Sequence, residues 1–228
     1  MDDVAKLIDS VAKLIGALVW PALIVFIVVR FGSAFSDFFS DLTELTFKGA
    51  GFEASAKRKQ REATAALVAA EVSRPQEGAT PEIVAEQAKA AAQLVVDNVT
   101  PGLLRRAGRS TVLWVDDRPK NNVHERQALE ALGVNFVIST STEDALEKMN
   151  RQSFDAIISD MSRPSDPRAG FTLLDKLRSD GNRTPFIVYA GPRALEQQAE
   201  LVRRGATGST NRPSELFEMV LNAVGRKT

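Results

Sequence analysis

From Ser110 onward, short apolar runs alternate with longer stretches that have helical spacing. Strands are expected at TVLWV (111–115), NFVIS (135–139), DAIIS (155–159), PFIVYA (185–190) and, more weakly, TGST (207–210). Helices are expected between them, near 121–132, 142–151, 170–179, 193–204 and 213–224. Strands separated by helices of this length form right-handed βαβ units and a mostly parallel sheet. The C-terminal half is therefore predicted to be an α/β domain.

Acidic residues follow two of these strands. Asp116 and Asp117 come directly after the first strand, and Asp160 comes directly after the third. Functional groups of such sheets collect at the carboxyl ends of the strands, so neighbouring strands would bring the three carboxylates together. Packed acids repel one another unless a cation neutralises them, and oxygen ligands of this kind suit Mg²⁺. Any one of these acids taken singly could instead cap a helix or face water.

On these motifs, residues 110–226 resemble a response-regulator receiver domain. VLWVDD is similar to the family's acid pair, IISDM to its phospho-acceptor strand, PFIVYAG to its fourth strand and GATGSTNRP to the stretch around its fifth. The resemblance implies a flavodoxin-like, five-stranded parallel sheet of order 2-1-3-4-5 with helices on both faces. It implies Mg²⁺ bound by Asp116, Asp117, Asp160 and the backbone carbonyl of Ser162. It also implies that Asp160 is the phospho-acceptor, with a histidine kinase or a small acyl phosphate as donor.

Three positions depart from the family pattern. Ala190 stands where receivers carry a hydroxyl residue after the fourth strand, and its side chain has no hydroxyl to donate a hydrogen bond. Ser209 replaces the switch aromatic, and Arg212 replaces a lysine with a longer, planar cation. The loop MSRPSDPRAG after Asp160 is also longer than usual. The chain is thus expected to be a signalling or regulatory protein, of the two-component or phosphorelay type, that acts through protein contacts.

Two alternatives to a phosphorylated receiver stay open. The first is a pseudo-receiver that serves only as a binding or oligomerisation module. The second is a small hydrolase, although the phosphatase motif D-x-D is replaced here by D-D, and the glutamates available to a TIR-type enzyme, Glu125 and Glu130, have ordinary amphipathic spacing. We therefore expect that the chain is not an enzyme.

The overall charge and the cysteine content exclude several further functions. Lys+Arg and Asp+Glu number 29 each, so no net field favours nucleic acid, and no direct nucleic-acid partner is expected. The chain has no cysteine, which excludes disulfides, cysteine nucleophiles and Cys-ligated zinc.

An uncharged apolar run, Leu14–Val29, lies between Lys13 and Arg30. Together with its apolar flanks it approaches the roughly 20 residues that a helix needs to cross a bilayer. A cleaved signal peptide and a buried core helix are the competing interpretations. Basic residues are more numerous after the run than before it, which predicts a single-pass protein of the inner (cytoplasmic) membrane with its C-terminal part in the cytoplasm.

Three regions are predicted. Residues 1–32 would form an amphipathic lead-in and a transmembrane helix, residues 33–109 a juxtamembrane segment and helical connector, and residues 110–228 the receiver-like domain. In the connector, 54–72 and 81–99 read as helices, and 100–110 reads as the boundary of the next domain. Whether these helices pair within one chain or between chains of a homo-oligomer stays open.

Overall fold

The computed structural model describes residues 52–76, 78–191 and 197–225. The expected membrane segment, Leu14–Val29, lies outside these residues, as does everything else predicted for 1–51. A search of the described residues finds no helix that combines the length and the apolar character needed to cross a membrane. Gly51–Thr228 forms one compact unit, which includes the helices of the expected connector.

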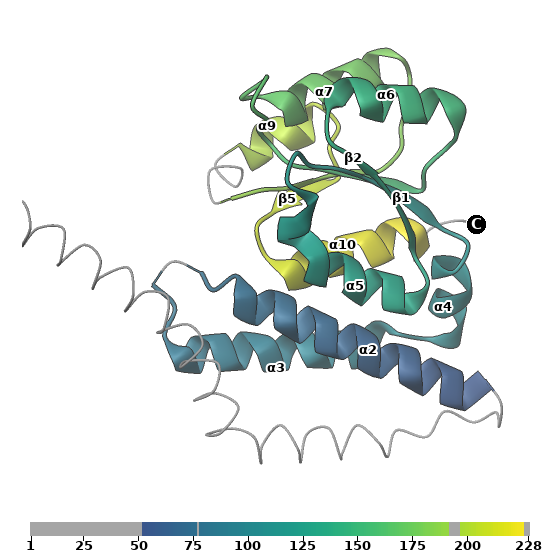
Figure 1. The fold of residues 1–228 in the computed structure, drawn as a ribbon, viewed down its shortest axis with the longest axis vertical. Helices are drawn as coiled ribbons and strands as arrows, with labels where there is room; N and C mark the ends of the chain where they lie inside the picture. Colours follow the sequence, from purple (N-terminus) through teal and green to yellow (C-terminus); the bar gives the residue numbers. More distant parts are fainter. Residues whose placement is uncertain (1–51, 77, 192–196, 226–228) are drawn as a thin grey trace, which may run out of the picture. The chain divides into compact units, whose positions relative to one another are not determined.

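The elements of this unit follow one another in a regular βα alternation after three initial helices (Figure 1). The strands are β1 (Thr111–Val115), β2 (Asn135–Ser139), β3 (Ala156–Ser159), β4 (Phe186–Tyr189) and β5 (Gly208–Thr210). The helices are α2 (Phe52–Ser73), α3 (Pro81–Asn98), α4 (Pro101–Ala107), the 3₁₀ helix η1 (Pro119–Asn122), α5 (Val123–Leu132), α6 (Thr142–Arg151), α7 (Ala169–Ser179), α9 (Gln198–Arg203) and α10 (Pro213–Gly225).

The five strands form one parallel sheet of order β2-β1-β3-β4-β5, which confirms the predicted sheet and its strand order. Val115 at the end of β1 pairs with Ser139 of β2 and with Ser159 of β3. The carboxyl ends of these three strands are therefore level. Whatever follows β1 and β3 in the sequence must emerge side by side.

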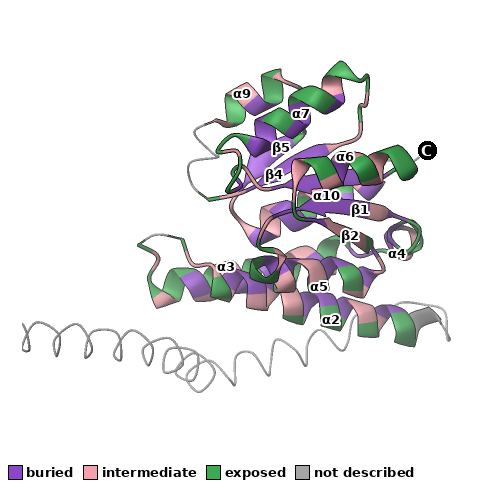
Figure 2. Ribbon diagram, turned by 45° about the horizontal axis from the view of Figure 1, so that its top comes forward, coloured by how far each residue is buried: buried purple, intermediate pink, exposed green. Residues whose placement is uncertain are grey.

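Strands β1, β3, β4 and β5 are buried on both faces, as expected for a parallel sheet, whereas the edge strand β2 is partly exposed (Figure 2). Alternate residues point to opposite faces, so Val112 and Trp114 join the core beneath α5 and α10. Leu113 and Val115 join a second core beneath α6, α7 and α9. This alternation explains why β1 reads as a nearly continuous apolar run.

Helix α2 packs against both α3 and α5, and α4 packs against α10. Side chains from all five helices belong to the same apolar core as Trp114, including Leu67, Val95, Leu104, Leu129 and Phe217. Helices α5 and α10 are consequently covered on two sides, by the sheet and by the α2–α3 pair. The connector helices thus pair with each other and with the receiver-like part of the same chain.

The segment 100–110 is not only a boundary, because it contains helix α4. Thr100 caps this helix by accepting a hydrogen bond from the amide of Leu103 at 3.2 Å, and Pro101 occupies the first helical position. The same Thr-Pro start signal opens α3 at Thr80. The sequence predicted only a domain boundary at 100–110 and no helix there.

One tight contact joins the turn after α4 to the turn after α5. Gly133 ends α5 with a left-handed φ of 106°. A Cβ atom added there would lie 3.1 Å from the Cα atom of Gly108, which follows α4. Glycine at 133 therefore satisfies both the backbone conformation and the close approach of the two turns.

Leu67→Ala should destabilise the protein by about 2 to 5 kcal/mol, because Leu67 is fully buried between the helix layers. Chemical denaturation of the full-length protein, followed by circular dichroism, measures this loss. Lys89→Ala, an exposed change on α3, serves as the control and should stay within about 0.5 kcal/mol of wild type. Equal stabilities of Leu67→Ala and the control would contradict the packing of α2 on α5.

Candidate functional site

Three acidic side chains meet where β1 and β3 end. One carboxylate oxygen each of Asp116, Asp117 and Asp160 lies within 4.8 Å of the other two. Backbone hydrogen bonds extend the sheet by one residue here: the amide of Asp116 donates to Ser139 at 2.9 Å, and that of Asp160 donates to Val115 at 3.0 Å. The sheet itself therefore holds two of the acids beside each other, as the sequence predicted. We call these three residues the acidic cluster.

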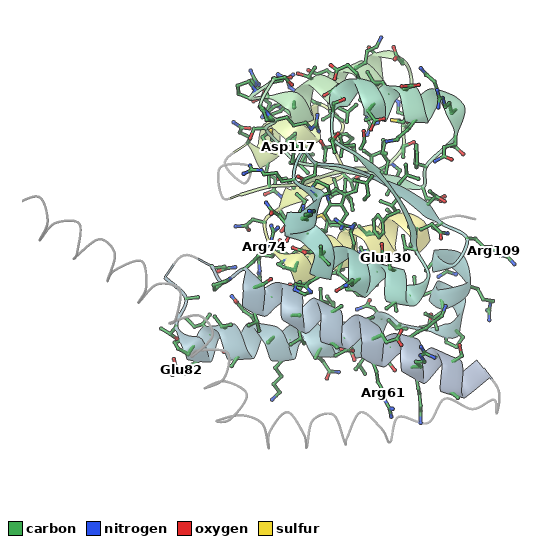
Figure 3. All side chains as sticks on the ribbon, in the orientation of Figure 1. Arg61, Arg74, Glu82, Arg109, Asp117 and Glu130 are labelled. Atoms are coloured by element: carbon green, nitrogen blue, oxygen red, sulfur yellow. The ribbon has the colours of Figure 1, made fainter. Side chains whose placement is uncertain are left out.

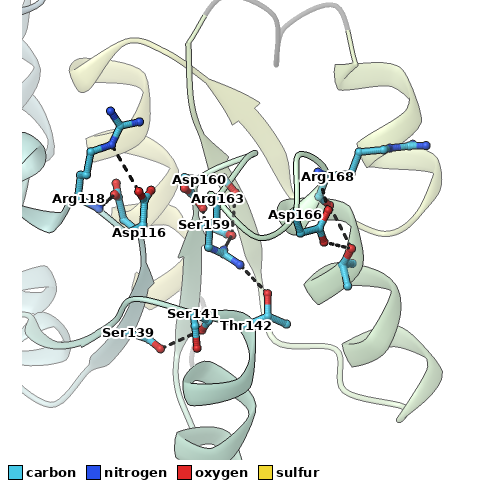
Figure 4. Close-up of polar contacts among 12 residues, drawn as sticks. Asp116, Arg118, Ser139, Ser141, Thr142, Ser159, Asp160, Arg163, Asp166 and Arg168 are labelled. Carbon is cyan, nitrogen blue, oxygen red and sulfur yellow. Dashed lines mark hydrogen bonds and ion pairs between the residues drawn. The ribbon is translucent and has the colours of Figure 1, made fainter.

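Asp116 is the most enclosed member, with 9% of its surface exposed. Its Oδ1 atom accepts a hydrogen bond from the amide of Arg118 at 2.6 Å (Figure 4). Its Oδ2 atom accepts one from the side-chain amide of Asn122. Both oxygens are thus oriented by donors on η1 and the turn before it. Asp117 is less enclosed and pairs loosely with the exposed Arg118, at 3.5 Å.

Asp160 has a positive partner in the loop that follows it. The Nε atom of Arg163 lies 2.9 Å from Oδ1 of Asp160, although their alignment leaves both atoms without a hydrogen bond. The other guanidinium nitrogens donate to the hydroxyls of Thr142, at 2.7 Å, and Ser159, at 2.6 Å (Figure 4). Arg163 is 5% exposed, so it is a fixed, buried cation rather than a mobile surface side chain.

The prediction from sequence did not single out Arg163 from the other charged residues of its loop. The signal that could have found it is its place three residues after Asp160, in a segment with the turn-forming pattern RPSD. Arg163 and Asp166 exchange two backbone hydrogen bonds, at 2.9 and 3.0 Å, and the tight loop they close turns the arginine back toward the sheet.

The other predicted site residues are placed as follows. Ser162 is exposed and lies two residues after Asp160, and its carbonyl stays a predicted ligand. Ala190 directly follows β4 and donates its amide to Thr210 at 3.2 Å. Ser209 is buried within β5. The guanidinium of Arg212 pairs with Glu215 at 3.0 Å. The cation beside Asp160 is therefore Arg163 rather than Arg212.

Glycine at position 170 allows helix α7 to start against the acidic cluster. A Cβ atom there would lie only 2.8 Å from the backbone oxygen of Asp160 and 3.2 Å from the Cα atom of Met161. The amide of Gly170 also donates to the carbonyl of Met161 at 3.0 Å. The backbone just after β3, at Asp160 and Met161, therefore packs directly against the start of α7.

The surroundings of Asp160 disfavour its charge. Burial raises the pKa of its carboxyl from 3.8 to about 7, against the lowering effect of Arg163 and with further raising by Asp116 and Asp117. A partly buried carboxylate next to two more carboxylates fits a hard cation. The donor set of the acidic cluster is therefore suited to Mg²⁺.

The glutamates considered for an enzyme have other surroundings. Glu125 is buried, accepts a hydrogen bond from Tyr189 at 2.8 Å and pairs with Arg74 at 3.0 Å. Glu130 is exposed on α5 (Figure 3). His124 is also exposed on this helix. None of these three belongs to the acidic cluster.

Comparison with known families agrees with this geometry. Residues 112–222, just under half of the 228, match the family model of the response regulator receiver domain. This match confirms the predicted resemblance for that part of the chain. Receiver domains are signalling modules, which supports the prediction that the chain is not an enzyme. No curated protein matches the chain.

Several solved receiver structures are similar to the same half of the chain. The Francisella response regulator 1452 receiver domain is 24% identical, with 52% of this chain and 99% of that one covered and a TM-score of 0.46. The chemotaxis response regulator CheY4 of Vibrio cholerae is 27% identical, with 50% of this chain and 98% of that one covered and a TM-score of 0.43. The receiver domain of sensor histidine kinase PA1611 from Pseudomonas aeruginosa is 22% identical, with 51% of this chain and 98% of that one covered and a TM-score of 0.43. That structure is described with a magnesium ion in its active site cleft.

In metal-free buffer, the contribution of Asp160 to the free energy of unfolding should fall as pH rises from about 4 to about 7 and then level off. Between its unfolded pKa of 3.8 and its folded pKa of about 7, Asp160 keeps its proton in the folded state and releases it on unfolding. The slope from this one group is at most about 1.4 kcal/mol per pH unit. Denaturant titrations at successive pH values measure it.

Asp160→Asn should lack this contribution, so the difference between wild type and variant isolates it. Parallel stability curves for the two proteins across this pH range would contradict the raised pKa.

Proposed function

We propose that the chain is a receiver-like signalling or regulatory protein whose acidic cluster binds Mg²⁺ and whose output is contact with other proteins. The observation that carries this proposal is the convergence of Asp116, Asp117 and Asp160 at the ends of two neighbouring strands. The match of 112–222 to receiver domains, which typically bind Mg²⁺ at an acidic site, supports it.

Asp160 is the proposed phospho-acceptor. A carboxylate oxygen of Asp160 would attack the phosphorus of an acyl phosphate or of a kinase phosphohistidine, and the bond from phosphorus to the donor oxygen or nitrogen would break. Bound Mg²⁺ would neutralise charge on the phosphoryl oxygens and on the carboxylates. Asp116 would be held as a ligand by the donors on its two oxygens, and the fixed Arg163 would contribute a second positive charge.

A pseudo-receiver is the second candidate, and one observation favours it. Arg163 already places a buried positive charge 2.9 Å from Asp160. This ion pair can compensate Asp160 without a metal or a phosphoryl group, and Ala190 offers no hydroxyl to report phosphorylation. In this second function, the fold would act only as a binding or oligomerisation module.

Titration of the full-length protein with Mg²⁺ tests the metal site. We expect a saturable rise in thermal stability and a change in the fluorescence of Trp114, which lies two residues before Asp116. Asp160→Asn should weaken binding by more than about tenfold, because it removes a ligand. Asp180→Asn makes the same chemical change on an exposed residue and should bind as wild type does. No Mg²⁺-dependent change in wild type would overturn the proposal.

Incubation with acetyl phosphate and Mg²⁺ then separates the two functions. A phosphorylated receiver gains the mass of one phosphoryl group, mapped to Asp160 and lost in Asp160→Asn. A protein that binds Mg²⁺ but shows no mass gain is a pseudo-receiver.

We further propose that the chain is a single-pass protein of the inner membrane with the receiver-like part in the cytoplasm. The apolar run Leu14–Val29 and the excess of basic residues after it support this proposal. Reporter fusions at residue 50 should give a cytoplasmic signal, and cell fractionation should place the protein in the membrane. An extracytoplasmic signal would reverse the orientation, and a soluble protein would remove the anchor.

A further inference from the structure

The end of helix α2 reaches a buried polar group of the receiver-like part. Arg74, directly after α2, places its Nε atom 3.0 Å from Oε1 of Glu125. Its terminal nitrogen donates to the carbonyl of Asn121 at 2.7 Å and also to the side-chain oxygen of Asn122. Its guanidinium lies 5.1 Å from the ring centroid of Tyr189. Arg74 thus makes four contacts with η1, α5 and β4.

Asn122 links this arginine to the acidic cluster. It is 2% exposed, accepts from Arg74 with its side-chain oxygen and donates its side-chain NH₂ to Oδ2 of Asp116. The opposite orientation of the Asn122 amide would place its oxygen against the carboxylate of Asp116 and its NH₂ against the guanidinium of Arg74. Both neighbours therefore favour the observed orientation of the amide. One side chain therefore separates Arg74 from Asp116.

The buried carboxylate of Glu125 needs the positive charge of Arg74 beside it. Only 3% of its surface is exposed, and its Oε1 atom accepts from the hydroxyl of Tyr189 at 2.8 Å. Burial raises the pKa of that hydroxyl, which keeps Tyr189 a proton donor to Glu125. Without Arg74, the carboxylate of Glu125 would be buried with no ion-pair partner among the described residues, which is strongly destabilising.

A second contact fixes the same turn of α2. Glu71, buried on α2, accepts a hydrogen bond at 2.7 Å from the amide of Ser214 at the start of α10. The end of α2 is thus attached to α10 through Glu71 and to α5 through Arg74. Figure 3 shows Arg74 at this end of α2, on the same side of the unit as Asp117.

We propose that Arg74 is a positioning residue that couples the acidic cluster to the α2–α3 pair. It orients Asn122, and Asn122 orients the carboxylate of Asp116 as a metal ligand. Because coupling between two equilibria is reciprocal, Mg²⁺ in the cluster holds the end of α2 more firmly on α5. This inference rests on the proposed Mg²⁺ site and adds a route from it to the preceding helices.

Hydrogen exchange and Mg²⁺ titration of the full-length protein test the coupling. In wild type, saturating Mg²⁺ should slow exchange at residues 68–76. In Arg74→Met, which keeps the packing but not the charge, Mg²⁺ affinity should fall about tenfold and this protection should disappear. Arg74→Lys should fall between the two because an ammonium cannot reproduce the guanidinium contacts. Arg109→Met, on an exposed arginine after α4, is the matched control and should behave as wild type.

Asn122→Ala keeps the ion pair between Arg74 and Glu125 and removes the link to Asp116. Its Mg²⁺-dependent protection at residues 68–76 should be lost, and this variant carries the test if Arg74→Met does not fold. The double variant should bind Mg²⁺ no more weakly than Asn122→Ala alone, because both changes interrupt one route.

The outcomes separate the two proposals. Absence of Mg²⁺ binding in wild type would overturn the proposed metal site and the coupling with it. Binding of equal strength by wild type, Arg74→Met and Asn122→Ala would overturn the coupling alone, as would protection at 68–76 that persists in Asn122→Ala.

Discussion

Repulsion among three carboxylates is the constraint around which this end of the molecule is arranged. The pairing of β1 with β3 holds Asp116 and Asp160 side by side, and neither can move away without breaking the sheet. The structure meets this repulsion with charges and donors of its own: Arg163 on Asp160, and the amides of Arg118 and Asn122 on Asp116. These partners come from separate loops, which ties the loop conformations to the acidic cluster.

Much of this arrangement could be predicted from the sequence. Apolar runs of strand length separated by amphipathic stretches determine a parallel sheet, and the acids after β1 and β3 meet once those strands are neighbours. The convergence of Asp116, Asp117 and Asp160 is thus a consequence of topology. The strand order itself came from resemblance to receiver domains, because local periodicity does not specify which strands pair.

The contacts that the sequence did not predict depend on how loops and helices return to the sheet. Arg163 and Arg168 belong to the same loop, yet the loop buries the first and leaves the second exposed. Arg74 and Glu125 are 51 positions apart and meet only because α2 packs on α5. The buried side of helix α2 is rich in alanine. Its residue pattern therefore predicted a helix but did not indicate which helix it packs against. The small side chains permit the close approach.

The covering of α5 and α10 by the α2–α3 pair has a consequence for recognition. A foreign protein that binds the α5–α10 face must displace helices belonging to the same chain. Such a tethered competitor acts at an effective concentration on the order of millimolar. It would weaken the binding of any weak or transient partner to that face. Among the described residues, the core beneath α6, α7 and α9 contains no side chain of α2 or α3. The α2–α3 pair therefore limits which face of this unit a partner protein can bind, before any side-chain specificity operates.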